Sequence, residues 1–478
     1  MPNAIAYLML AAWPLVTLAL FRRLDRAQAL IWSLVAGYLL LPPEPAAFDF
    51  PLLPPFNKLM IAHLSLVAAL FLLARGRDTG PGPGQWIARW LPESTLMRFL
   101  LGLFVLSPIA TVLANPEPLV FVRQVIPGLG ARDALALTIT QGLLLIGFLL
   151  ARRFLSGPGA ARALLVALMV SGLAYSLPML LEIRLSPQIN MWVYGFYQHD
   201  FRQTLRGGGF RPLVFLPHGL WAAFFLLSSL IAAIGLWRAA AEATRPRLLL
   251  AVVWLGAVLV LAKSLGALIF AAALVPLLLL TGARTQLHIA AMLGVLALAY
   301  PALKAADAVP AQALLEQAEK IDSERAGSLR FRFVNEDRLF ARANQKPLTG
   351  WGSWGRNQIR DEVTGEITSI SDGRWIIVLG EFGWPGFLAE FGLLALPLLL
   401  LWRETRLLPA EAVPPLLGPL ALILGINMID LLPNATLTPL TWLAAGAVLG
   451  QAERLKRRRR REALIRGALA ERHPRTII

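Results

Sequence analysis

The chain has 478 residues, of which 57% are hydrophobic and 15% charged, so roughly 270 apolar residues must be kept away from water. One soluble core of this length holds far fewer, which excludes a soluble globular domain and indicates a membrane protein. Lys and Arg (45) outnumber Asp and Glu (29), giving a net charge of +16, and the lack of cysteine excludes disulfides, zinc–cysteine sites and thiol nucleophiles.

Apolar runs of about 20 residues, the length of a membrane-spanning helix, recur along the whole chain. They predict thirteen spans, near residues 3–21, 27–43, 58–75, 97–114, 133–151, 160–181, 213–236, 247–263, 265–282, 286–304, 375–402, 412–431 and 435–450. The amino terminus lacks the positive charge that begins a signal peptide, so we expect it to be retained. The fold class expected is an all-α polytopic membrane helix bundle of about 12–13 spans.

Basic residues in the short connections indicate the topology. The run Lys456–Arg461 directly follows an apolar span, which predicts a cytoplasmic carboxyl terminus near anionic headgroups rather than a nucleic-acid-binding surface. The other short basic connections then fall on the same side, as the positive-inside rule requires: Arg22, Arg23, Arg26, Arg75, Arg77, Arg152, Arg153, Arg238, Arg245, Arg247, Arg284, Arg403 and Arg406. An odd number of spans places the amino terminus outside, and a missed or false span near 247–282 would reverse that end.

Two external segments are rich in arginine, although external arginine does not help insertion. The first, residues 182–212, contains Arg184, Arg202, Arg206 and Arg211, with His199 and Asp200 beside them. The second, residues 305–374, is the only long hydrophilic stretch between spans. The predicted domains are therefore a membrane bundle (1–304, including the Arg-rich loop 182–212), an external subdomain (305–374), C-terminal membrane helices (375–450) and a basic tail (451–478).

The centre of the second segment predicts a helix over about 323–344. Apolar residues recur there at helical spacing, and basic residues recur near every fourth position or its double: Leu329, Phe333, Leu339 and Phe340, and Arg330, Arg338 and Arg342. Glycine and tryptophan follow at Gly350, Trp351, Gly352, Trp354 and Gly355, which predicts a turn that ends the helix near the bilayer surface.

External arginines indicate an anionic ligand, because the guanidinium group binds phosphate bidentately and keeps its charge in proteins. A diphosphate carried on a lipid would suit the arginines of the first loop and the row on the external helix. The glycines at 207–209 would let the backbone approach it. The alternative is that these arginines pair with Asp200, Glu336 and Asp337 or meet lipid headgroups.

Proton acceptors for transfer to a hydroxyl also lie near the external face. The candidates are Glu182, His199, Asp200, His218, Asp372 and Glu381. Asp430 and Asn434 lie at the outer end of a late span, where we expect a hydrogen bond that fixes two helix ends. The sequence has no metal-binding signature, so we expect neither a metal nor another cofactor.

The external helix and the residues after it resemble the O-antigen ligase and polymerase superfamily. The resemblance covers about residues 325–390 and follows an Arg ahead of a helix, a Pro-Leu-x-Gly-x-Gly turn and a Glu-x-Gly-x-x-Gly start of the next span. The residues that carry it are Arg330-Phe331-Arg332, Asn344 through Gly352, Ser371 through Trp375 and Leu379 through Gly386.

The resemblance implies a GT-C-like membrane glycosyltransferase of the bacterial inner membrane, with the segment 305–374 in the periplasm. It would take a glycan from a polyprenyl diphosphate and pass it to a glycan acceptor, and it could work together with polysaccharide-assembly partners. Carried over by position, Arg332 or Arg330 would meet the diphosphate, with Arg202, Arg206 and Arg211 completing the site. Catalytic roles are expected for Asp372, Arg211 and Arg332, and substrate binding for Arg184, His199, Arg202, Arg206, His218, Arg330, Arg338 and Glu381.

One departure from the family pattern bears on the acceptor. Counted back from Glu381, the position of the family's loop histidine is Asp372 here. This favours an O-antigen or exopolysaccharide polymerase over a ligase that transfers to the lipid A core. The competing classes are a transporter or flippase of lipid-linked glycan, for which Lys263 beside Ser264 is the best feature, and an inactive assembly scaffold.

Overall fold

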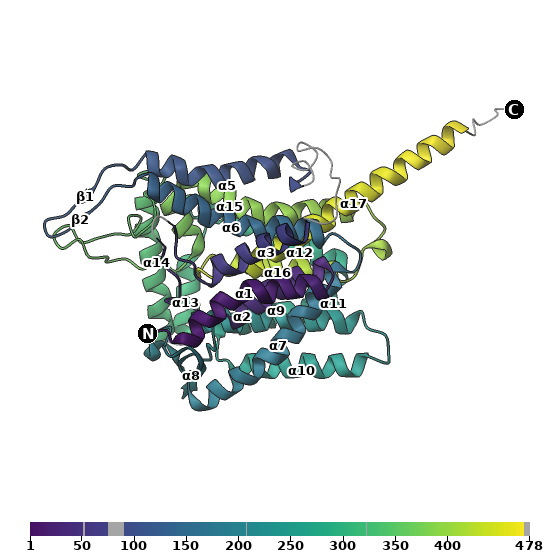
Figure 1. Ribbon diagram of the computed structural model, residues 1–478, viewed down its shortest axis with the longest axis horizontal. Coiled ribbons are helices and arrows are strands. Elements are labelled where there is room, and N and C mark those ends of the chain that lie inside the picture. Colours follow the sequence, from purple (N-terminus) through teal and green to yellow (C-terminus); the bar gives the residue numbers. More distant parts are fainter. Residues whose placement is uncertain (51–52, 75–89, 207, 322, 473–478) are drawn as a thin grey trace.

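The protein is a bundle of helices that run side by side along its long axis (Figure 1). The computed structural model describes residues 1–50, 53–74, 90–206, 208–321 and 323–472. Arg75 and Arg77, two of the predicted topology residues, lie outside these ranges. The side chain of Arg206 is likewise outside the description.

The helices of the first half of the chain are α1 (Ala4–Arg23), α2 (Arg26–Leu40), α3 (Lys58–Ala74), α5 (Thr95–Leu113), α6 (Ala131–Phe154), α7 (Ala160–Leu185), α8 (Ile189–Tyr194) and α9 (Gly219–Arg238). Those of the second half are α10 (Arg245–Leu261), α11 (Leu265–Leu280), α12 (Ala283–Ala305), α13 (Ala311–Ile321), α14 (Ser323–Ala343), α15 (Arg374–Arg406), α16 (Leu417–Asp430) and α17 (Pro439–Arg472). The described residues also form two short hairpins, β1 (Leu119–Val120) with β2 (Val125–Ile126) and β3 (Leu205–Arg206) with β4 (Gly209–Phe210). Two short 3-10 helices, η1 (Phe201–Thr204) and η2 (Ala410–Ala412), complete their regular structure.

The predicted fold class, an all-α polytopic membrane bundle, is confirmed. Each of the thirteen predicted spans overlaps a helix. Within the part of the chain that the structure describes, seven helices are long and apolar enough to cross a membrane: α1, α5, α6, α7, α9, α12 and α15. Large apolar side chains on the outside of the bundle are exposed, among them Leu15 (70%), Leu106 (59%) and Leu280 (83%). Such exposure is costly in water but not against lipid tails.

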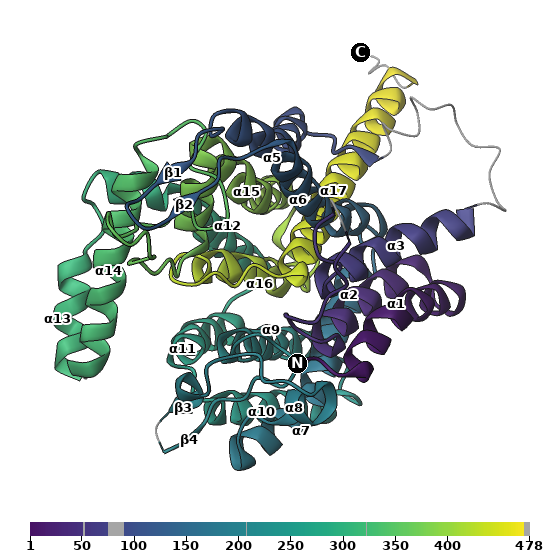
Figure 2. The ribbon, with the colours of Figure 1, turned by 60° about the vertical axis from the view of Figure 1, so that its left-hand side comes forward.

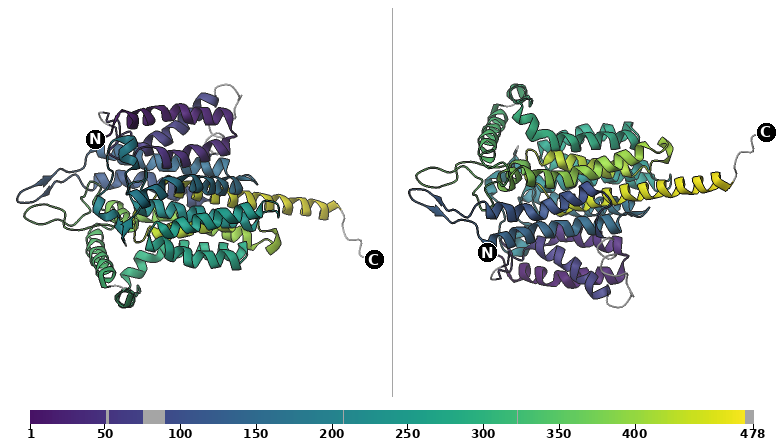
Figure 3. Two further views of the ribbon diagram at one scale, coloured as in Figure 1. Left: turned by 90° about the horizontal axis from the view of Figure 1, so that it is seen from below. Right: turned by 90° about the horizontal axis from the view of Figure 1, so that it is seen from above.

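The two ends of the bundle differ. One end, called the loop end below, carries the hairpin β1–β2 and the helices α13 and α14, and the amino terminus lies there (Figure 1). At the other end, called the tail end, α17 continues well beyond the other helices as a straight rod (Figure 3). The amino terminus and the described end of α17, Arg472, therefore lie at opposite ends of the bundle.

Close packing of α17 against α6 anchors this rod. A Cβ atom on Gly446 would lie 2.2 Å from the Phe148 carbonyl oxygen, and one on Gly450 would lie 2.4 Å from that of Arg152. Glycine lets the two backbones touch, which is the usual device where lipid tails supply no hydrophobic drive. Arg152 and Glu453, both buried, join the same helices in an ion pair of 2.8 Å.

The external subdomain lies across the loop end. Helices α13 and α14 run roughly perpendicular to the bundle and stand at its edge (Figures 1 and 2). Helix α14 confirms the helix predicted over 323–344, and the turn after it has left-handed backbone at Gly350, Gly352 and Gly355. The segment that carries β1–β2 is also part of this subdomain, since Arg123 N–H donates to the Val363 carbonyl at 3.0 Å.

Helix α15 bends sharply at Gly383. Gly383 has φ 67° and ψ −171°, a conformation essentially limited to glycine. The bend allows Arg374 and Glu390, sixteen residues apart, to form a bidentate ion pair with N–O distances of 2.7 and 2.6 Å. On a straight helix they would lie about 24 Å apart. The span predicted at 375–402 is thus two helical segments folded toward each other.

Gly383→Ala is expected to destabilise the protein by about 1–3 kcal/mol, because Ala is strained in this conformation. Its Cβ atom would also lie 2.5 Å from the Pro347 carbonyl oxygen. The check is the thermal unfolding midpoint in detergent. Gly256→Ala in α10 is the matched control, since a Cβ there meets no atom within 4 Å and Ala is the better helix former. Equal midpoints for Gly383→Ala and wild type would contradict the role given to the bend.

Candidate functional site

Residues 211–216, called the strapped segment below because buried side chains hydrogen-bond to its backbone, lead from the hairpin β3–β4 toward α9. The carboxylate of Glu182, buried at the end of α7, accepts the N–H groups of Leu213 (2.7 Å) and Val214 (2.8 Å). The Tyr175 hydroxyl accepts the N–H of Phe215 at 3.0 Å. Glu182, predicted as a possible proton acceptor, therefore fixes the backbone of this segment through Oε2. Its Oε1 accepts the N–H of Ile189 at the start of α8.

The strapped segment fixes Arg211 and His218 at the start of α9. The stem of Arg211 lies over Gly219, where a Cβ atom would be 2.2 Å from Arg211 Cδ. His218 caps the helix, since its Nδ1 accepts the N–H of Leu220 at 2.9 Å. In the neutral ring this leaves the proton on Nε2, so His218 is set to donate a hydrogen bond. The ring of His199 packs against it edge-on, with centroids 4.4 Å apart.

Lys263 is a third basic residue at this place. It lies between α10 and α11 with φ 53°, and its Nζ reaches the hairpin β3–β4, so that a Cβ on Gly209 would lie 2.4 Å away. Lys263 beside Ser264 is also the feature that would best fit a transporter. Its position against a glycine of the Arg-rich loop could not be found from the sequence, because the two residues are far apart along the chain.

The second group of charged residues lies between α14 and the start of α15. Arg332 Nε and Asp372 Oδ2 form an ion pair of 3.2 Å in which both side chains stay partly exposed (41% and 37%). Arg332 also lies within electrostatic reach of Asp430. Asp430 in turn accepts hydrogen bonds from Asn434 and Thr436, so the predicted link between these helix ends is present.

The basic row predicted on α14 does not face one ligand. Arg330 pairs with Glu319 of α13, Arg332 pairs with Asp372, and Arg338 is exposed. Arg342 stacks on the ring of Trp351, 4.1 Å from its centroid, and donates to the Arg356 carbonyl. Three of these arginines therefore hold separate parts of the subdomain.

A basic cluster around Trp351 was not foreseen. Arg356 is buried and donates to the carbonyls of Trp351, Pro127 and Glu117, which ties the glycine turn to the β1–β2 segment. The Lys346 ammonium group also lies over the Trp351 ring, with Nζ 4.7 Å from the ring centroid. Burial lowers the pKa of Lys346, and the neighbouring Arg356 and Arg342 lower it further. The signal for this cluster, basic residues around a Trp-Gly turn, is visible in the sequence.

The glycine turn and the bend of α15 form one unit. Trp351 N–H donates to the Gly380 carbonyl (2.8 Å), Gly352 N–H to that of Glu381 (3.0 Å), and Trp384 N–H to that of Pro347 (2.7 Å). The side chain of Glu381 interacts with Ser353 and lies near Arg374. Glu381 thus faces the turn, and the segments 347–352 and 381–386 together hold the bend.

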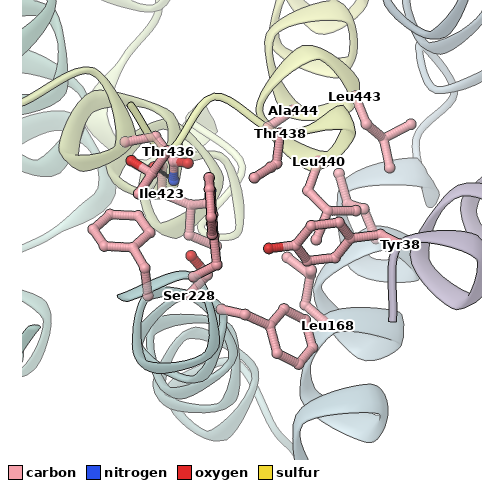
Figure 4. Close-up of a pocket in the computed structure, with 14 residues that line it drawn as sticks. Tyr38, Leu168, Ser228, Ile423, Thr436, Thr438, Leu440, Leu443 and Ala444 are labelled. Atoms are coloured by element: carbon pink, nitrogen blue, oxygen red, sulfur yellow. Dashed lines mark hydrogen bonds between the residues drawn. The ribbon is translucent and has the colours of Figure 1, made fainter. Parts of the chain in front are cut away.

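A narrow pocket lies among the helices of the bundle. Its wall is mostly apolar and comes from α2, α7, α9, α16 and α17, and the Tyr38 hydroxyl points into it (Figure 4). Trp221, whose ring lies 6.4 Å from that of His218, lines one side. Thr436, which donates to Asp430, lines another. The pocket therefore neighbours His218 through Trp221 and Asp430 through Thr436, while the charged residues of the two groups are not part of its wall.

The remaining predicted residues lie outside these two groups. Arg184 is exposed in the last turn of α7, and Arg202 is exposed in η1. The described contacts of Arg332 run to Asp372 and Asp430, and those of Arg211 run to the start of α9. Closure of both segments around one diphosphate stays a prediction.

The sequence matches no protein-family model and no curated protein. Function must therefore be argued from the residues and their geometry.

Proposed function

We propose that this protein is a membrane glycosyltransferase that moves a glycan from a polyprenyl diphosphate to a glycan acceptor, as an O-antigen or exopolysaccharide polymerase. The observation that carries the proposal is one pocket whose wall contacts a residue of each group, since Trp221 lies beside His218 and Thr436 donates to Asp430. The first offers a fixed arginine and a fixed hydrogen-bond donor, Arg211 and His218. The second offers a carboxylate beside an arginine, Asp372 and Arg332.

In the proposed reaction the acceptor hydroxyl attacks the anomeric carbon of the donor. The new C–O bond forms as the bond from that carbon to the diphosphate oxygen breaks, with inversion. Asp372 takes the proton of the hydroxyl; its ion pair with Arg332 uses Oδ2, so Oδ1 can accept it. The arginines stabilise the negative charge that develops on the diphosphate, which leaves with the bonding electrons. No metal takes part in this proposal.

The proposed orientation follows from loop charge. The tail end, with Lys456–Arg461, lies in the cytoplasm, and the loop end faces the periplasm of a bacterial inner membrane. Both groups then lie at the outer surface, where lipid-linked glycans are presented. The position of Lys263 against the hairpin β3–β4, at the loop end, removes the main support for a transporter, whose ionisable groups are expected near the midplane.

The direct test is incubation of the purified protein in nanodiscs with polyprenyl-diphosphate oligosaccharide from its host, followed by glycan sizing. A ladder together with released polyprenyl diphosphate is the expected result. Transfer only after addition of a lipid A core acceptor would indicate a ligase instead. Bound but unconverted donor with every acceptor tried would overturn the enzymatic proposal, and flux assays would then test transport.

Asp372→Asn is expected to lower turnover about 10²–10⁴-fold, the usual contribution of a positioned proton acceptor, without abolishing donor binding. Glycan sizing measures turnover, and retention of labelled donor measures binding. Glu362→Gln in the same subdomain is the control, because Glu362 is exposed and lies outside both groups. Turnover by Asp372→Asn equal to that of wild type would remove Asp372 as the base.

A further inference from the structure

A second cavity lies at the tail end, far from the proposed transfer site. It has a volume of about 240 Å³, many times the ~10–15 Å³ that one water needs. It opens between the start of α5, the end of α15 and α17. The charged and polar side chains that line it are Glu93, Ser94, Thr95, Arg403, Glu404, Glu453 and Lys456.

The carboxylates of this cavity are already neutralised. Glu93 pairs with Lys456 (3.2 Å) and Arg457 (2.8 Å). Glu404 pairs with Arg403 (3.0 Å) and Arg459 (2.8 Å), and it is buried. Glu453, also buried, pairs with Arg152 (2.8 Å). Three carboxylates thus meet five cations, of which Arg403 and Lys456 line the cavity and Arg152, Arg457 and Arg459 lie behind its wall.

The start of α5 adds to this positive potential. Ser94 caps the helix and Thr95 is its first residue, and both line the cavity. The amino end of a helix carries partial positive charge and unpaired N–H groups, which favour an anion. The cavity also lies where the apolar parts of α5, α15 and α17 end, which is the level of lipid headgroups.

We propose that this cavity binds a phosphate group, with Lys456 and Arg403 as its principal cations. Lys456 is 20% exposed and Arg403 57% exposed, so both can turn toward a ligand while Arg457 and Arg459 keep the carboxylates paired. The same chemistry is offered by the headgroup of an anionic phospholipid and by free phosphate. Basic cavities between helix ends are a known form of lipid headgroup site. The proposal does not depend on the transfer reaction.

The test measures the thermal unfolding midpoint of the purified full chain in detergent. Three probes are titrated at constant ionic strength: inorganic phosphate, phosphatidylglycerol and phosphatidylcholine. We expect a saturable rise with a phosphate anion and a much weaker effect of phosphatidylcholine. A higher unfolding midpoint with phosphatidylglycerol alone identifies a lipid headgroup as the ligand. A higher midpoint with inorganic phosphate as well shows that the free anion also binds. Either result supports the site.

The decisive comparison uses two double variants with equal loss of charge from the same helices. Arg403→Gln with Lys456→Gln is expected to weaken the apparent affinity for the active probe at least about tenfold. Arg406→Gln with Arg458→Gln is the control, because Arg406 stacks on Trp402 and Arg458 pairs with Glu462. If the first double variant is unstable, Lys456→Gln alone is compared with Arg458→Gln. No saturable response in wild type, or equal weakening in the control, would overturn the proposal.

Discussion

Arg211→Ala is expected to stop glycan extension, lowering turnover by at least about 10²–10³-fold at unchanged protein level. This is the usual cost of removing one fixed donor to a developing negative charge. The structure gives Arg211 a fixed origin, because its N–H donates to the Thr204 carbonyl at 2.8 Å. The residues after it are held by the carboxylate of Glu182. Because the backbone at Arg211 is already held in place, little conformational entropy is lost there when a diphosphate binds.

The control for this prediction is Arg132→Ala, which removes an exposed arginine at the start of α6, at the same end of the bundle. Arg211→Lys should recover only part of the activity, because an ammonium group cannot reproduce the bidentate fork. Glycan sizing in nanodiscs measures all three variants. Full activity of Arg211→Ala would exclude Arg211 as a ligand of the leaving group.

Gly219→Ala tests the same residue without removing its charge. The new methyl group would lie 2.2 Å from Arg211 Cδ, so the arginine stem must move. A displacement of this kind should lower turnover about 10-fold or more, since small misplacements of catalytic groups are costly. Unchanged activity here, with a loss in Arg211→Ala, would mean that the charge of Arg211 matters and its position does not.

The helices and their order could be predicted from the sequence because membrane insertion leaves a local signal. About 20 apolar residues are needed for each crossing, and each run can be found without knowing its neighbours. The helix α14 and the glycine turn at 350–355 also have local signals, namely helical periodicity and residues that adopt left-handed backbone. These elements were predicted because each is determined by residues close together in the chain.

The contacts that build the site have no local signal. The bend at Gly383 was hidden within an apolar run that reads as one span, and only the pairing of Arg374 with Glu390 reveals its size. The β1–β2 segment joins the external subdomain through Arg356, more than two hundred residues later. The row of arginines on α14 shares a period, but its members bind different partners, which periodicity cannot distinguish.

Glu390→Gln is expected to cause the largest loss of stability among single variants, about 3–5 kcal/mol, the usual cost of breaking a buried ion pair by removing one partner. Glu390 is fully buried and binds Arg374 through both oxygens. The neutral amide would leave the charge of Arg374 without its carboxylate in a region of low dielectric. The thermal unfolding midpoint in detergent measures the effect, and Glu411→Gln, an exposed carboxylate after α15, is the control.

The double variant Arg374→Met with Glu390→Met separates the ion pair from the bend that it closes. Apolar side chains of similar size leave no buried charge, so the double variant should be more stable than Glu390→Gln. If the ion pair is also needed to form the bend of α15 at Gly383, the double variant will still lose glycan transfer. The reason is that this bend positions both the glycine turn at 350–355 and Asp372. A double variant less stable than Glu390→Gln would show instead that the pair stabilises the bend beyond the cost of an unpaired charge.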